Sequence, residues 1–236
     1  MTEEVKLKVD GQIEDIINHY NVTIEDLYEE KNPGLIRSKK GKLVEETAQR
    51  IVKAAWVAYL GQSEDRLKQD KKKKAMRILN ADEYLQRYES VTIRDTIKSK
   101  KSSIKYDFGT DDHVYVDGKL VLAIECKSYT ESAMLKRIIY DRKMLHEYSP
   151  ETDYILIQFE SALGGDFELC SNSTFGSNQY HVFMSREKTN IDIITLLENR
   201  RRSKQPIHKR EHRKELKKEH LLHAILIVSE KLKAYV

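Results

Sequence analysis

The sequence contains only two cysteines and three prolines among its 236 residues. Cys126 and Cys170 have no nearby His or Cys at a zinc-like spacing, which argues against a disulfide framework and for a reducing cytosol. No run of about 18 apolar residues exists, so no membrane-spanning helix is expected. The N-terminal residues MTEEVKLKVDGQ lack the apolar core of a signal peptide. We therefore expect a cytoplasmic protein.

Charged residues make up 34% of the chain and hydrophobic residues 39%, a balance typical of solvated helices around a modest core. The net charge of +4 is small, but basic residues cluster. The clusters lie at residues 71–74, 98–105, 200–202 and 209–214. Each fits either a surface that binds phosphates or the solvated face of a helix.

Apolar spacing predicts helices toward both ends and strands in the middle. A period of 3.6 residues predicts helical structure within residues 1–40, broken at Asn32-Pro33-Gly34, and helices over 42–60 and 131–148. Further helices are predicted over 193–197 and from Pro206 toward Lys233. Apolar and β-branched runs predict strands at residues 113–116, 120–126, 154–159 and 180–184.

The order of strand, helix and strand predicts an α/β fold, with a mixed central sheet flanked by helices. The length fits one domain over residues 1–236. Within it we expect a core at about 42–185, a helical N-terminal part over 1–40 and a basic helical C-terminal part over 189–236.

Asp117-Gly118 lies between two strand-like runs and predicts a hairpin whose two-residue turn needs positive φ. With this turn Val116 pairs with Lys119. Counting back along two regular strands then places Asp112 opposite Ala123.

In this register Asp112 shares one face of the hairpin with Glu125 and Lys127, while Asp111 points to the other face. Two carboxylates held together repel each other unless a cation lies between them. Mg²⁺ prefers oxygen ligands and keeps several waters. Asp112, Glu125 and the backbone carbonyl of Cys126 supply three such oxygens. The sequence therefore predicts a magnesium site, with Lys127 positioned to stabilise developing negative charge.

Asp112, followed after twelve residues by Glu125-Cys126-Lys127 at the end of an apolar strand, resembles the motif of the PD-(D/E)xK nuclease superfamily. That superfamily includes most type II restriction endonucleases, as well as resolvases and repair nucleases. The resemblance covers about residues 42–185 and implies that Asp112 and Glu125 bind metal and that Lys127 is the catalytic lysine. Asp111 stands where many members have proline. It is the alternative ligand, although the hairpin parity favours Asp112.

Superfamily members often carry a metal-proximal glutamate on the helix before the hairpin. Glu45 lies beside the apolar stripe of the helix predicted over 42–60, so it is the candidate for this auxiliary role. The alternative is a boundary residue whose carboxylate reaches solvent.

The resemblance implies a Mg²⁺-dependent endodeoxyribonuclease, most like a type II restriction endonuclease acting on double-stranded DNA. A palindromic target would imply a homodimer with one active site per strand. Two alternatives remain. One is another nuclease of the superfamily that acts on branched or modified DNA, and the other is a non-catalytic DNA-binding protein.

Overall fold

The computed structural model describes all residues except 72, 79, 164–177, 190 and 199–203. The chain divides into two compact units. The larger unit consists of Met1–Asp70 and Asp111–Val236, and the smaller unit is Lys71–Thr110. The sequence pattern predicts one domain and marks no boundary at either point.

The larger unit is built on a five-stranded mixed sheet with the strand order β1-β4-β5-β6-β7. β4 pairs antiparallel with both β1 and β5, whereas β6 pairs parallel with both β5 and β7. The strands are β1 (Leu67–Asp70), β4 (Asp112–Val116), β5 (Lys119–Thr130), β6 (Asp153–Ser161) and β7 (Asp192–Thr195). The predicted α/β fold with a mixed central sheet is confirmed.

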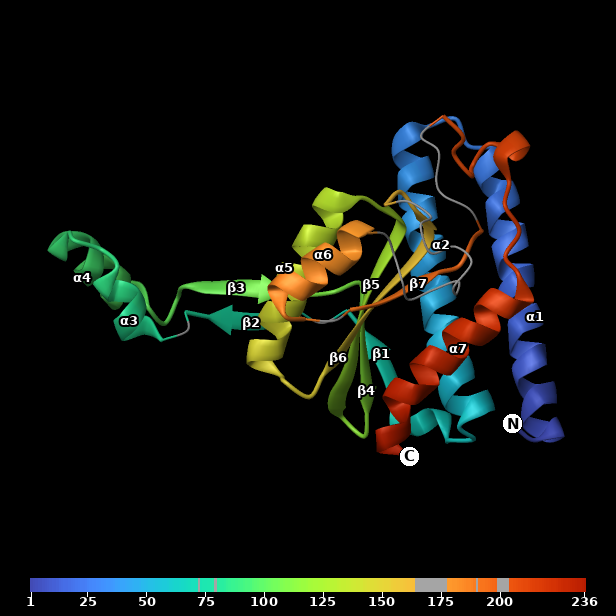
Figure 1. The fold of residues 1–236 in the computed structure, drawn as a ribbon, viewed down its shortest axis with the longest axis horizontal. Coiled ribbons are helices and arrows are strands. Elements are labelled where there is room, and N and C mark those ends of the chain that lie inside the picture. Colours follow the sequence, from blue (N-terminus) through green and yellow to red (C-terminus); the bar gives the residue numbers. More distant parts are fainter. Residues whose placement is uncertain (72, 79, 164–177, 190, 199–203) are drawn as a thin grey trace. The chain divides into compact units, whose positions relative to one another are not determined.

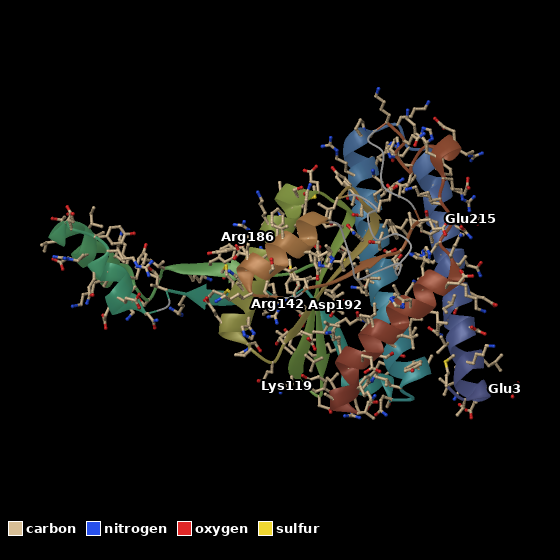
Figure 2. The ribbon with its side chains drawn as sticks, viewed as in Figure 1. Glu3, Lys119, Arg142, Arg186, Asp192 and Glu215 are labelled. Carbon is tan, nitrogen blue, oxygen red and sulfur yellow. The ribbon has the colours of Figure 1, made fainter. Side chains whose placement is uncertain are left out.

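Helices cover both faces of this sheet: α1, α2 and α7 lie on one face, and α5 and α6 on the other (Figure 1). α5 connects β5 to β6, which confirms the predicted crossover helix. Figure 2 shows the side chains, with Glu3 at the start of α1 and Lys119 next to the β4–β5 turn. The helices of this unit are α1 (Glu3–Tyr28), α2 (Pro33–Lys53), α5 (Ser132–Tyr148), α6 (Asn178–Glu187) and α7 (Lys218–Leu232).

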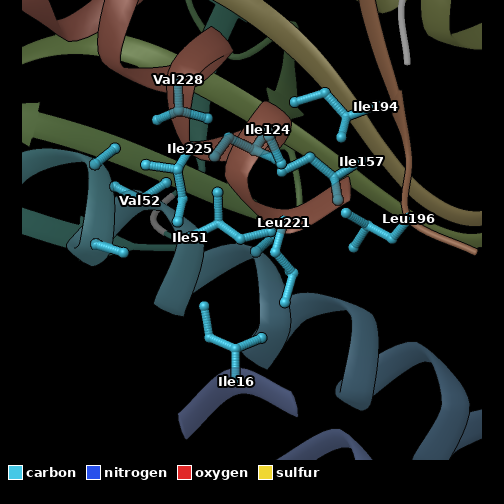
Figure 3. Packing of buried hydrophobic residues seen from close by; sticks show 14 of the residues in the cluster. Ile16, Ile51, Val52, Ile124, Ile157, Ile194, Leu196, Leu221, Ile225 and Val228 are labelled. Atoms are coloured by element: carbon cyan, nitrogen blue, oxygen red, sulfur yellow. The ribbon is translucent and has the colours of Figure 1, made fainter. Parts of the chain in front are cut away.

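The main hydrophobic core lies between the sheet and the layer of α1, α2 and α7 (Figure 3). Ile124 and Ile157 of the sheet, Ile51 of α2 and Leu221 of α7 are all fully buried there. Burial of one such side chain contributes about 1.5–3 kcal/mol, so this layer holds the sheet in place.

α2 begins earlier than the predicted start at residue 42. The Asn32 side chain accepts the backbone N–H of Gly34 at 2.9 Å, and Pro33 occupies the first helical turn, where its missing N–H costs nothing. The Asn-Pro-Gly sequence that reads as a break is therefore a helix start. α2 continues into a π-helical segment, Ala54–Tyr59, and the chain then turns at Gly61 with a φ of 68°.

Residues 180–184, predicted as a strand, belong to α6. Tyr180 and Met184 are buried, whereas Val182 is 48% exposed. A strand would place these three side chains on one face, but a helix turns the middle one away.

Residues 193–197, predicted as a helix, instead contain part of β7. Ile193 and Ile194 are consecutive and both buried, as in a strand covered on both faces. A short continuous apolar run fits a buried strand and a buried helix alike, so the spacing does not distinguish them.

The last helix, α7, begins at Lys218 and not near Pro206. The preceding residues include a short 3₁₀ turn, Arg210–His212, and a single β-bridge between Leu197 and Leu216. Ile207 and Leu216 are buried, so this irregular segment is packed into the core.

The smaller unit contains a two-stranded antiparallel ribbon and two helices. Its elements are β2 (Lys74–Arg77), α3 (Ala81–Gln86), α4 (Val91–Lys100) and β3 (Lys105–Phe108). α4 has no buried residue. In both units, none of the described helices is long and apolar enough to cross a bilayer.

We expect Leu221→Ala to lower the free energy of unfolding by about 2–5 kcal/mol, because it leaves a cavity in the packed core. The matched control is Leu35→Ala on α2, where the leucine is 50% exposed. Its effect should stay within about 0.5 kcal/mol. Urea denaturation measures both, and equal losses would contradict this placement of α7.

Candidate active site

The β4–β5 hairpin has the predicted turn. Asp117 and Gly118 have φ angles of 50° and 80°, and Val116 pairs with Lys119. Positive φ at both central residues matches the twist of the flanking strands, which is why Asp-Gly is favoured here.

One extra residue in β5 shifts the register beyond the turn. Tyr115 pairs with Leu120, but the preceding residue Val114 pairs with Leu122. Val121 is therefore the additional residue of a β-bulge, where two residues of one strand oppose one of the other.

The predicted face of Asp112 is wrong because of this bulge. Asp112 pairs with Ile124, not with Ala123, and is fully buried. Ile124 belongs to the core beneath α2, so Asp112 lies on that face of the sheet. Asp111, one residue earlier, is left on the face of Glu125.

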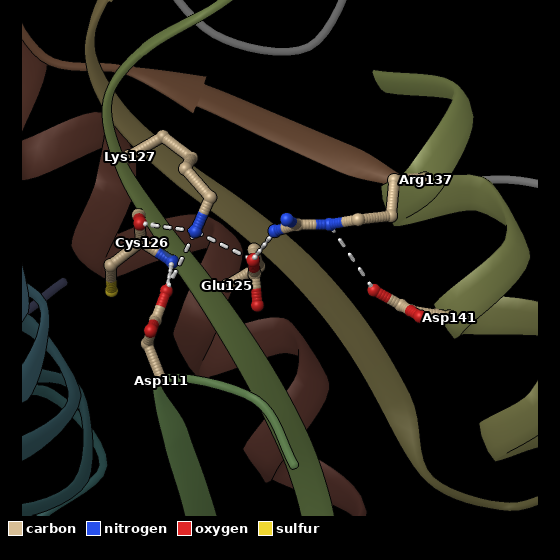
Figure 4. Close-up of polar contacts among 6 residues, drawn as sticks. All are labelled: Asp111, Glu125, Cys126, Lys127, Arg137 and Asp141. Atoms are coloured by element: carbon tan, nitrogen blue, oxygen red, sulfur yellow. Dashed lines mark hydrogen bonds and ion pairs between the residues drawn. The ribbon is translucent and has the colours of Figure 1, made fainter. Parts of the chain in front are cut away.

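The ammonium group of Lys127 brings the cluster together (Figure 4). Lys127 Nζ lies 2.6 Å from Glu125 Oε1 and 3.0 Å from Asp111 Oδ2. It also donates to the backbone carbonyl of Cys126 at 2.9 Å. Asp111 Oδ2 additionally accepts the backbone N–H of Cys126 at 2.8 Å, which ties the residue before β4 to β5.

Helix α5 contributes two residues that the sequence pattern did not single out. Arg137 Nη2 lies 3.2 Å from Glu125 Oε1, and Arg137 Nε lies 3.9 Å from Asp141 Oδ2 (Figure 4). The Glu125 side chain is 7% exposed, whereas that of Arg137 is 62% exposed. The available signal was the position of α5 directly after the strand that carries Glu125, with an Arg and an Asp four residues apart on it.

Burial and the nearby Asp111 carboxylate raise the pKa of Glu125, although Lys127 and Arg137 oppose the shift. For Lys127, burial alone would lower the pKa, but the carboxylates of Glu125 and Asp111 outweigh it and raise the pKa. Lys127 is therefore a cation here, and both burial and the Asp111 carboxylate disfavour the ionised form of Glu125.

Asp111, Glu125 and the Cys126 carbonyl fit a hard divalent cation. Two carboxylates that contact one ammonium, with a carbonyl beside them, match the oxygen ligands of Mg²⁺. Among the described residues, no three His, Cys, Asp or Glu side chains form a metal-binding group. These few oxygen ligands suit Mg²⁺, because Mg²⁺ keeps several waters in its coordination shell.

The environment of the Cys126 thiol indicates where Glu45 lies. Burial raises the pKa of this thiol well above its usual value, and the carboxylates of Asp111, Asp112 and Glu45 raise it further. Glu45 belongs to α2, the helix that packs against β5. Its neighbour Glu46 bonds His19 at 2.8 Å. The auxiliary role of Glu45 stays a prediction.

Comparisons with known proteins find a curated relative and a distant structural neighbour. No family model matches the sequence. The type II restriction enzyme DdeI of Desulfomicrobium norvegicum is 38% identical over 200 residues, which cover 84% of this chain and 82% of that protein. A native BbvCI A2B2 tetramer structure aligns over 98% of this chain and 92% of that chain, with 12% identity and a TM-score of 0.38. That structural likeness is too weak to support an argument.

The raised pKa of Glu125 predicts that Glu125→Gln stabilises the metal-free protein at neutral pH. A group with a raised pKa favours folding below its unfolded pKa and loses that contribution as pH rises through the folded value. The free energy of unfolding of the variant should therefore increase relative to that of the wild type as pH rises from about 4 to 7 in EDTA. Urea denaturation at each pH measures this difference.

The matched control is Glu147→Gln, an exposed residue on α5. It should show no such pH-dependent gain. A Glu125→Gln protein whose stability relative to the wild type is the same at both pH values would contradict a raised pKa of Glu125, and with it the effect of burial and of the Asp111 carboxylate.

Proposed function

The chain belongs to the type II restriction enzyme family, and we propose that it is a Mg²⁺-dependent endonuclease that cuts double-stranded DNA at a short specific sequence. The observation that carries the proposal is the contact of Lys127 with both Asp111 and Glu125 at the end of an apolar strand. This arrangement supports membership of the PD-(D/E)xK superfamily, whose motif the sequence resembles.

Asp111 and Glu125 would hold Mg²⁺ together with the backbone carbonyl of Cys126. When bound, the ion would supply Lewis acidity toward water and the phosphodiester. The carboxylate of Asp111, and not that of Asp112, is the ligand in this proposal, because Asp111 Oδ2 already meets Lys127 and the backbone of Cys126.

Lys127 would stabilise the negative charge that develops during attack on the phosphate. Its ammonium is fixed by three oxygen contacts before DNA arrives, and it is a cation because the carboxylates raise its pKa. A preorganised charge in a partly buried site costs little reorganisation during the reaction. Arg137 would position Glu125 from α5.

A palindromic target would be cut by a homodimer, with one catalytic cluster for each strand. Sedimentation at assay concentration tests this part. A monomer that remains a monomer on DNA while cutting both strands would contradict it.

We expect the wild-type protein to cut unmethylated phage DNA into discrete fragments with Mg²⁺ and to leave it intact with EDTA. Lys127→Ala should lower the cleavage rate by about 100-fold or more, as loss of a charge-stabilising group does in other enzymes.

The matched control is Lys119→Ala on the same strand, next to the turn (Figure 2). Lys119 is exposed and pairs with Glu151 at 3.2 Å, so its loss should leave cleavage unchanged. DNA that stays intact under every condition, or cleavage that survives in Lys127→Ala, would refute the proposed activity.

A further inference from the structure

The positive charge of this protein is concentrated in the smaller unit. Residues 71–110 carry 11 of the 42 basic residues but only 5 of the 38 acidic ones. The formal charge of this segment is +6, whereas that of the whole chain is +4. The rest of the chain is therefore net negative.

The other basic region, near the C-terminus, is neutralised within the protein. Arg210 and Arg213 each contact Glu25 of α1 at 2.9 Å. Lys214 contacts the buried Glu160 of β6, and Lys217 lies 2.6 Å from Glu198. These cations attach the segment before α7 to α1 and to the sheet. The cluster at residues 200–202 lies outside the described residues.

Four lysines of the smaller unit are not neutralised in this way. Lys73, Lys98, Lys100 and Lys101 are exposed, and none has an ion pair with any residue that the structure describes. Among the described residues of the unit, ion pairs join Arg87 to Glu83 and Lys105 to Asp107. Four unpaired cations on a short segment repel one another, and a polyanion would relieve that repulsion.

The smaller unit buries few apolar side chains. α4 buries none of its ten residues, and among the described residues of the unit the buried apolar ones are Phe108, Ala81 and Leu85. A 40-residue unit with so small a core gains little stability from burial. Its charged helix and ribbon are therefore available for a partner.

The chain connects this unit directly to the catalytic cluster. It leaves the larger unit at Asp70, whose strand partner is His113 of β4, and returns at Asp111. Asp111 is the residue that contacts Lys127. Under the proposed function Asp111 is a metal ligand, so the smaller unit is joined along the chain to a residue of the catalytic cluster.

We propose that Lys71–Thr110 is a phosphate-binding insertion that holds the backbone of the double-stranded DNA to be cut, whereas Arg210, Arg213, Lys214 and Lys217 are structural. The proposal rests on the proposed nuclease function and adds the surface that holds its substrate. Lys98, Lys100 and Lys101, at the end of α4, contact backbone phosphates. They set affinity and its salt dependence without reading bases.

The test compares DNA binding of two triple variants in EDTA, where no cleavage interferes. The first is Lys98→Gln with Lys100→Gln and Lys101→Gln. The control is Lys6→Gln with Lys31→Gln and Lys204→Gln, three exposed lysines of the larger unit that have no ion pair with any residue the structure describes. Both change the net charge equally, so they separate local contact from overall charge.

Each lysine that neutralises a phosphate contributes about 0.9 to the slope of log K against log salt. The first variant should reduce that slope by about two to three units, and the control by less than one. A third variant, Arg210→Gln with Arg213→Gln, should lower the unfolding midpoint but keep the slope. All should be folded by circular dichroism, since the changed lysines are exposed.

Equal slopes for the first variant and the control would overturn this inference. The inference would also fail if the first variant lost self-association while its DNA binding stayed as strong as that of the wild type, because the unit would then be a contact between copies of the protein. If the wild type cuts DNA in Mg²⁺ while the slopes are equal, only the insertion's role fails. If the wild type neither cuts nor binds DNA, the proposed function fails with it.

Discussion

The contact of the Lys127 ammonium with the carboxylates of Asp111 and Glu125 is the interaction on which the site depends. Burial raises the pKa of Glu125, and the neighbouring carboxylate of Asp111 raises it further, whereas the Lys127 cation opposes the shift. The sheet holds these side chains in place. Its apolar strand carries Glu125 and Lys127 on one face, while Ile124 anchors the other face in the core. Under the proposed function, a bound divalent cation would also offset the repulsion between these two carboxylates.

A single residue, Val121, decides which aspartate takes part. Because it is extra in β5, the pairing beyond it moves by one, and the side-chain alternation carries Asp112 into the core-facing layer. Asp111 then takes the place that a regular hairpin would give to Asp112. Local structure also decides which cations form ion pairs. Arg210, Arg213 and Lys217 pair within the protein, whereas the lysines at the end of α4 have no ion pair with any described residue. Clusters that look alike in sequence therefore differ in their contacts.

The sequence was informative where a local rule forces the structure. The Asp117-Gly118 turn, the crossover helix and the mixed sheet follow from turn chemistry and apolar period, and the structure has all three. The bulge could not be predicted, because Val121 and Leu122 are both apolar and both buried, so alternation gives no sign of the extra residue. The short apolar runs at 180–184 and 193–197 fit helix and strand alike, so tertiary packing determines which of the two forms. Arg137 reaches Glu125 only through the packing of α5 on the sheet.

The most direct test of the account is a calorimetric comparison of Mg²⁺ binding to Asp111→Asn and Asp112→Asn, with the wild type as reference and thermal unfolding as the fold control. Both variants remove one carboxylate charge with little change in size. We predict that Asp111→Asn abolishes measurable binding, whereas folded Asp112→Asn retains it. Binding that survives in Asp111→Asn and is lost in folded Asp112→Asn would contradict the assignment of Asp111 to the metal site, and with it the role given to the bulge.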